Sequence, residues 1–92
     1  MSKFRVIIKE EAQQDLKKLL RYEPASYKKA MKLIAELLEH PRTGTGKPEA
    51  LSGNRAGQWS RRISQKHRLI YSIEDMTVTV IVLTAYGHYD DK

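Results

Sequence analysis

The chain has 92 residues, of which 40% are hydrophobic, with no cysteine and a formal net charge of +6. This length allows one domain, residues 1–92, and the lack of cysteine excludes disulfides, thiolate zinc sites and cysteine nucleophiles. No apolar run approaches the roughly 20 residues of a membrane-spanning helix, and the N-terminus lacks the apolar region of a secretory signal. We therefore expect a cytoplasmic protein with no membrane partner.

The first forty residues predict a strand followed by two helices. Residues 3–9 are rich in β-branched side chains, which favours a strand. Residues 10–21 have helical spacing of apolar side chains, with acids in the first turn and bases in the last. Pro24 suits the start of a second helix over residues 24–40, which ends at Pro41. The apolar stripes of this predicted helical hairpin are Ala12, Leu16, Leu19 and Leu20, then Ala30, Leu33, Ile34, Leu37 and Leu38.

The second half predicts a long loop and three strands. Residues 42–56 contain turn-forming residues and no apolar period, and loops of this length tend to be functional or disordered. Residues 58–64, 67–73 and 76–84 predict strands, and their short links favour an antiparallel meander. This order predicts an α+β fold, β-α-α-β-β-β, with two helices on one face of a four-stranded, mainly antiparallel twisted sheet.

Alternation along the predicted strands separates the residues that face the helices from those on the open face. Trp59 and Tyr71 lie on the same face of their strands as the apolar residues, so they are expected in the core. Arg61 lies on the same face as Trp59. Arg61 is thereby expected to be structural. Arg62 and Arg68 have the opposite parity and are expected on the open face, although a shift of one residue in register would reverse this.

Positive charge is concentrated in the middle of the chain. Seven Lys or Arg residues stand between Arg42 and Arg68 against one acid, Glu49. A polyanion is a natural partner for such a segment, because neutralising phosphates releases counterions. A solvated basic surface or an acidic protein partner would give the same pattern.

The residues of this segment and the C-terminus include candidates for each part of RNA cleavage. The reaction needs a base for the 2′-hydroxyl, cations for the transition state and an acid for the leaving 5′-oxygen. Glu49 is the candidate base, and Arg62 and Arg68 could grip one phosphate together. His88 is the candidate acid, and Tyr89 could hydrogen-bond a phosphate or stack on a base.

Each candidate also has a structural interpretation. Glu49 could be a loop carboxylate paired with a base, the two arginines could serve solubility, and His88 could be idle in a frayed tail. Three scattered histidines do not form a zinc pattern. Residues 44–47 lack the strand and the spacing of a phosphate-binding P-loop. We therefore expect neither a metal nor a cofactor.

Four motifs stand in order along the chain: GTGKPEAL at 44–51, GQWSRRI at 57–63, HRLIY at 67–71 and HY at 88–89. Over nearly the whole domain they closely resemble the YoeB/Txe branch of toxins in the RelE/ParE superfamily. The resemblance implies a RelE-like fold and a messenger RNA interferase of a type II toxin–antitoxin system. Such an enzyme acts at the ribosomal A site without a metal and leaves a cyclic phosphate or 3′-phosphate and a 5′-hydroxyl.

The resemblance also implies a role for each matching residue. Glu49 would be the general base, Arg68 would stabilise the transition state and His88 would be the general acid. Tyr89 would orient the substrate. Arg62 and His67 would assist phosphate or RNA binding, and we also expect Lys47 and Arg61 among the substrate-binding residues.

The chain departs from the family pattern at a few positions. Residues 90–92 extend past the His-Tyr pair, Ser52 stands where a lysine is common, and Lys66 stands where an acid is common. The changes at Ser52 and Lys66 affect the expected secondary RNA contacts and not the acid–base residues. The implied partners are the ribosome with its messenger RNA, a second copy in a homodimer, and a cognate antitoxin whose acidic, partly disordered C-terminal segment masks the site.

Two other functions remain open from the sequence. The related ParE branch shares this architecture and inhibits DNA gyrase without RNA cleavage. A basic RNA-binding module would need the charge but give no special role to Glu49. The complete Glu/Arg/His/Tyr set favours the ribonuclease.

Overall fold

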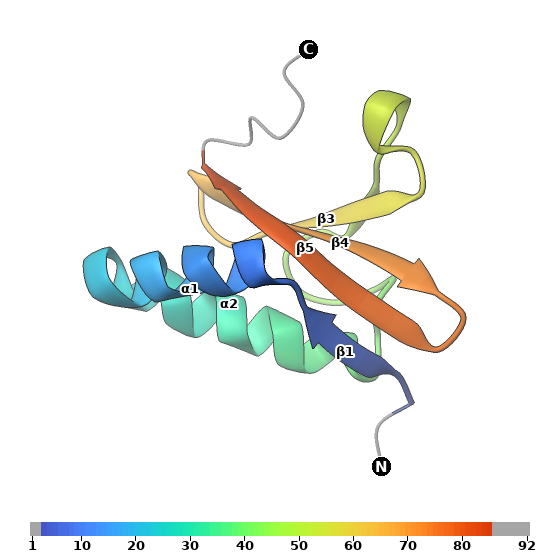
Figure 1. Cartoon of the computed structure of the whole chain (residues 1–92), viewed down its shortest axis with the longest axis horizontal. Coiled ribbons are helices and arrows are strands. Elements are labelled where there is room, and N and C mark those ends of the chain that lie inside the picture. The colour runs from blue at the N-terminus through green and yellow to red at the C-terminus, as the bar shows by residue number, and fades with distance from the viewer. Residues whose placement is uncertain (1–2, 86–92) are drawn as a thin grey trace.

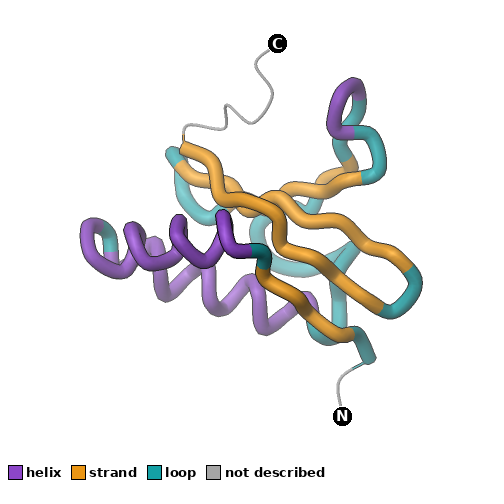
Figure 2. The backbone as a smooth tube through the Cα atoms, viewed as in Figure 1, coloured by secondary structure: helices purple, strands orange, loops and turns teal. Residues whose placement is uncertain are grey.

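The computed structural model describes residues 3–85, which form two layers, with a pair of helices packed on one face of a twisted sheet (Figures 1 and 2). The elements are β1 (Arg5–Ile8), α1 (Glu10–Tyr22), α2 (Pro24–Leu37), β2 (Glu49–Ala50), η1 (Gly53–Arg55), β3 (Gln58–Arg62), β4 (His67–Glu74) and β5 (Thr77–Ala85). The predicted α+β class and the two-helix hairpin are confirmed. Neither helix in this range is both long and apolar enough to cross a bilayer.

The sheet has five strands, one more than expected. The strand order is β1-β5-β4-β3-β2, with β1 parallel to β5 and the other neighbours antiparallel. The additional strand, β2, lies inside the predicted loop, where Glu49 pairs with Ser60 and Ala50 pairs with Trp59. Two residues are too few to show a periodic pattern, so the sequence could not indicate this strand. Glu49 therefore lies on a sheet edge rather than on a free loop.

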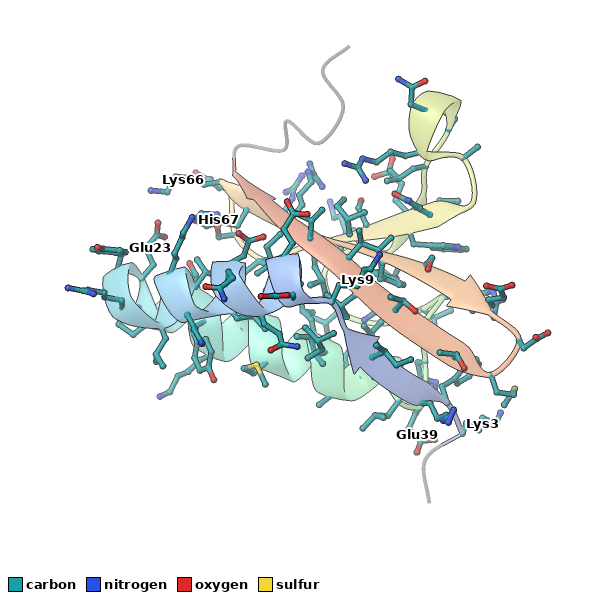
Figure 3. All side chains as sticks on the ribbon, in the orientation of Figure 1. Lys3, Lys9, Glu23, Glu39, Lys66 and His67 are labelled. Carbon is teal, nitrogen blue, oxygen red and sulfur yellow. The ribbon has the colours of Figure 1, made fainter. Side chains whose placement is uncertain are left out.

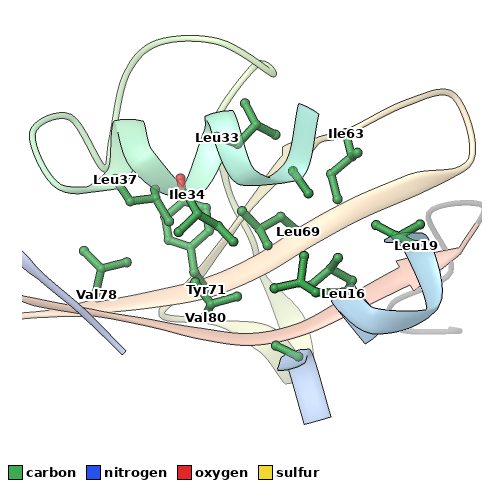
Figure 4. Close-up of a cluster of buried hydrophobic side chains, with 13 residues drawn as sticks. Leu16, Leu19, Leu33, Ile34, Leu37, Ile63, Leu69, Tyr71, Val78 and Val80 are labelled. Atoms are coloured by element: carbon green, nitrogen blue, oxygen red, sulfur yellow. The ribbon is translucent and has the colours of Figure 1, made fainter. Parts of the chain in front are cut away.

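Both helices bury one apolar face against the sheet (Figure 4). Leu20 was expected in the stripe of α1 but is 53% exposed, because Ala12, Leu16 and Leu19 already fill the face turned to the sheet. α2 ends at Leu37, three residues before the expected end, and a turn follows it. The hydrophobic core between the helices and the sheet consists of the buried residues Ala12, Leu16, Leu19, Ala30, Leu33, Ile34, Leu37, Ile63, Leu69, Tyr71, Val78, Val80 and Leu83.

A β-bulge changes which residues of β5 face the core. Ile70 lies opposite Val82 and Tyr71 lies opposite Val80, so one residue of β5 is extra at this point. The extra residue changes the parity of the strand, which allows both Val80 and Leu83 to face the core. Beyond the bulge, β5 continues alongside the start of β4, and the backbone N–H of Leu83 donates a 3.0 Å hydrogen bond to the Asp15 carboxylate on α1.

Candidate functional site

The register of β2, β3 and β4 brings three predicted residues to the sheet face turned away from the helices. Residues directly opposite each other in an antiparallel pair share a face. Arg62 lies opposite Arg68, and Glu49 lies opposite Ser60, two residues before Arg62. With strands about 4.8 Å apart and a rise of about 3.3 Å per residue, the Cα atoms of Glu49 and Arg68 are roughly 12 Å apart. Their long side chains can meet at one phosphodiester group between them.

Arg62 and Arg68 are a directly opposed pair of cations on neighbouring strands. Arg62 is exposed and Arg68 is partly exposed, as their parity predicted. Like charges in this position repel each other. An anion held between the two guanidinium groups removes the repulsion and accepts hydrogen bonds from both. The pair is therefore suited to binding a phosphate.

The loop before β2 is held against β3 through a glycine. Gly46 has a φ of +86°, and its carbonyl oxygen accepts a 2.7 Å hydrogen bond from the backbone N–H of Arg62. A Cβ at Gly46 would lie 2.9 Å from the Arg62 carbonyl oxygen, so this close approach requires glycine. Lys47, the next residue, has a φ of +51°, which costs a side-chain-bearing residue on the order of 1 kcal/mol. The GTGKPE motif thus brings a cation and an acid beside the arginine pair.

Arg61 points to the opposite face and holds the same loop from inside. Its side chain is fully buried, with 0% exposed. Its guanidinium donates hydrogen bonds to Glu36 at 2.8 Å, Tyr71 Oη at 3.2 Å and the carbonyl oxygens of Thr43 at 2.6 Å, Thr45 at 3.2 Å and His40. The structural role expected from its parity is confirmed. This burial corrects the expectation that Arg61 contacts the substrate.

Glu36 links α2 to this loop through several hydrogen bonds. Its carboxylate accepts hydrogen bonds from the Thr45 backbone N–H at 3.0 Å, the Thr45 hydroxyl at 2.7 Å and Arg61. Burial by itself would raise the pKa of Glu36, but the hydrogen bonds from Thr45 and Arg61 and the positive charge of Arg61 hold it below its ordinary value of 4.5. No local sequence pattern could indicate this role, because the Glu36 partners are distant in the chain.

Because the pKa of Glu36 is lowered in the folded protein, we expect the free energy of unfolding to fall at acidic pH. The stabilisation is fully present above about pH 4.5 and is lost as the pH falls through the folded-state pKa. The free energy of unfolding, measured by urea denaturation from neutral pH to about pH 3, should fall more steeply for the natural chain than for Glu36→Gln. Parallel curves for the two proteins would show that Glu36 makes no such contribution.

His67 faces the helices and not the arginine pair. Its Nε2 lies 3.1 Å from Oε2 of Glu23, at the junction of α1 and α2, and the Lys66 amine lies 3.5 Å from the same oxygen (Figure 3). The hydrogen bond to His67 lowers the pKa of Glu23, against the opposing effect of burial. The His67 side chain is 15% exposed. His67 is therefore directed away from the face that carries Arg62 and Arg68, and its part in RNA binding stays a prediction.

His88 and Tyr89 lie outside the described residues. The last described residues of β5 pair with the start of β4, Thr84 with Arg68 and Ala85 with His67. Between residues 3 and 85, no group of three or more His, Asp or Glu side chains could hold a metal ion.

Comparison with known proteins gives the family. A family model described as YoeB-like toxin of bacterial type II toxin-antitoxin system matches residues 8–89. Toxin YoeB of Mycobacterium bovis is 48% identical over 58 residues, which are 63% of this chain and 66% of that protein, just under two thirds of its length.

Solved structures agree with this match. A YoeB/ParE toxin from Agrobacterium tumefaciens has a TM-score of 0.80 at 30% identity, covering 89% of this chain and 98% of that one. Staphylococcus aureus YoeB, solved as a dimer, has a TM-score of 0.77 at 27% identity over 90% of this chain and 97% of that one. The structure of the heterotetrameric YoeB–YefM complex from S. aureus gives a TM-score of 0.76 at 28% identity, covering 88% of this chain and 94% of that one. This chain therefore belongs to the YoeB-like toxins of bacterial type II toxin–antitoxin systems, in the RelE/ParE superfamily.

Proposed function

We propose that this toxin is a metal-independent endoribonuclease that cleaves messenger RNA at the ribosomal A site and thereby inhibits translation. The observation that carries the proposal is the register of β2, β3 and β4, in which an acid and two opposed cations share one face. A purely basic binding surface has no need of an acid among its cations. Glu49 is therefore the residue that distinguishes an enzyme from a binding module.

In the proposed reaction Glu49 takes the proton of the 2′-hydroxyl, whose oxygen attacks the adjacent phosphorus. The bond from the 2′-oxygen to phosphorus forms while the bond to the 5′-oxygen breaks, which leaves a cyclic phosphate and a 5′-hydroxyl. Arg68 stabilises the additional negative charge of the transition state. Arg62 and Lys47 hold the substrate phosphates. No metal is needed, because the nucleophile is part of the substrate.

His88 donates the proton that the leaving 5′-oxygen requires, and Tyr89 orients the substrate. The support is the sequence match and the position at which β5 ends. Ala85 lies opposite His67, one residue from Arg68.

The proposed partners are the ribosome, a cognate antitoxin and a second copy of the toxin. The S. aureus relative has been solved both as a dimer and with YefM. An antitoxin segment carrying acidic residues would neutralise the arginine pair and cover Glu49, which would prevent RNA from binding. Activity on ribosomes implies that the toxin acts in the cytoplasm.

The proposal is tested by inducing the chain in cells and mapping the 5′ ends of transcripts. We expect new ends within translated regions, and far fewer after induction of Glu49→Gln. The matched control is Glu74→Gln, which makes the same change at the other end of β4, roughly 20 Å along the strand from Arg68. A DNA-damage response without new RNA ends would instead support the gyrase-inhibiting alternative.

A further inference from the structure

Ser60 is a buried polar residue whose role neither the core nor the proposed chemistry explains. It lies in the middle of β3 with 0% of its surface exposed, and its hydroxyl has no hydrogen-bond partner among the residues the structure describes. Burying an unpaired hydroxyl costs about 1–3 kcal/mol. Buried polar groups in native proteins nearly always have a partner. The hydroxyl of Ser60 is therefore expected to find one in another state of the protein.

The nearest side chains on the same face include one carboxylate that can accept a hydrogen bond from the Ser60 hydroxyl. Ser60 lies opposite Glu49 on β2 and opposite Ile70 on β4, and its neighbours along β3 are Gln58 and Arg62. Ile70 has no polar atom, and the arginine guanidinium has no acceptor. The Gln58 side-chain oxygen already accepts a 2.9 Å hydrogen bond from Arg55. Of these four neighbours, Glu49 is the one with a carboxylate available to accept from Ser60.

The distance is suitable for this hydrogen bond. Cβ atoms of directly opposed residues on antiparallel strands are about 4.5–5.5 Å apart. A rotation of the Glu49 side chain can therefore bring one carboxylate oxygen to the Ser60 hydroxyl. Glu49 is exposed on a two-residue edge strand, where little else fixes its direction.

We propose that Ser60 is a positioning residue, which donates a hydrogen bond to one oxygen of the Glu49 carboxylate when RNA is bound. The other oxygen then faces the 2′-hydroxyl and takes its proton. RNA covering the site excludes water from the carboxylate, which makes the hydrogen bond from Ser60 more favourable. This inference rests on the proposed role of Glu49 as the general base.

The test compares Ser60→Thr with Ser60→Val. Both substitutions add volume at the same buried position, and their side chains have nearly the same shape, so their difference isolates the hydroxyl. Cleavage of messenger RNA on purified ribosomes is measured under single-turnover conditions at increasing toxin concentrations. We expect Ser60→Val to cleave about tenfold more slowly than Ser60→Thr at saturation, with similar half-saturating concentrations. Equal maximal rates would overturn the inference.

Two further measurements separate positioning from folding. In the Glu49→Ala background, which removes the acceptor, the difference between the valine and threonine variants should disappear from the residual activity, because the two residues act as one unit. A difference that persists would mean that Ser60 acts elsewhere. Ser60→Val should also be at least as stable to urea as Ser60→Thr, and a lower stability would show that the hydroxyl already has a partner in the free toxin. If the natural chain cleaves no RNA, the proposed function is wrong. If the natural chain is active but the threonine and valine variants cleave at equal rates, only the proposed role of Ser60 is wrong.

Discussion

Arg61→Met is expected to lower the free energy of unfolding by about 3 kcal/mol, although Arg61 has no proposed part in the chemistry. The substitution removes the cation that pairs with Glu36 and leaves the carbonyl oxygens of residues 40, 43 and 45 without this donor. Removing one partner of a buried ion pair costs about 3–5 kcal/mol. The lower end applies here, because the Glu36 side chain is 25% exposed and water can partly solvate its carboxylate.

The matched control is Arg62→Met, the same change one residue later. Arg62 points to the open face and is exposed, so we expect a change within about 0.5 kcal/mol. Urea unfolding followed by circular dichroism measures both variants against the natural chain. Similar losses for the two variants would mean that the buried network around Arg61 contributes little to stability.

Alternation predicted which face the residues of β3 and β4 would take, but not their exposure, since Ser60 and Ile70 share the face of Arg62 and Arg68 and are buried. The period of two is a property of the pleated backbone, and Arg61, Ile63 and Leu69 are buried as their parity required. It could not predict β2, because two residues show no pattern, or the bulge in β5, because an unbroken run of apolar side chains hides a change of parity. These two features decide where Glu49 lies and where β5 ends.

The candidate substrate-binding residues were predicted by chemical type and motif, which do not say on which face of the sheet each side chain lies. His67 and Arg68 are adjacent in one motif, but neighbouring residues of a strand point to opposite faces. The partners that fix the inward-facing residues are distant in sequence: Glu23 is 44 residues from His67, and Glu36 is 25 residues from Arg61. No local pattern can reveal such pairs, because folding alone brings them together.

The largest expected effect on activity comes from Arg68→Ala. We expect the single-turnover rate of RNA cleavage on ribosomes to fall about 10²–10³-fold, the loss typical of removing one donor that stabilises transition-state charge. Arg68 lies on β4, between β3 and β5, and is less exposed than Arg62. Electrostatic stabilisation is stronger where water is partly excluded.

Arg62→Ala provides the comparison, since it removes the opposed cation from the more exposed position. We expect it to raise the half-saturating toxin concentration and to lower the maximal rate by no more than about tenfold, because a phosphate contact mainly contributes to binding. Arg68→Lys should recover only part of the lost rate, since an ammonium cannot make the bidentate contact of a guanidinium. Urea unfolding of each variant ensures that rates are compared between folded proteins. An Arg68→Ala rate within a few-fold of the natural chain would remove Arg68 from the reaction, because a residue that stabilises the transition state cannot be deleted without slowing the chemical step.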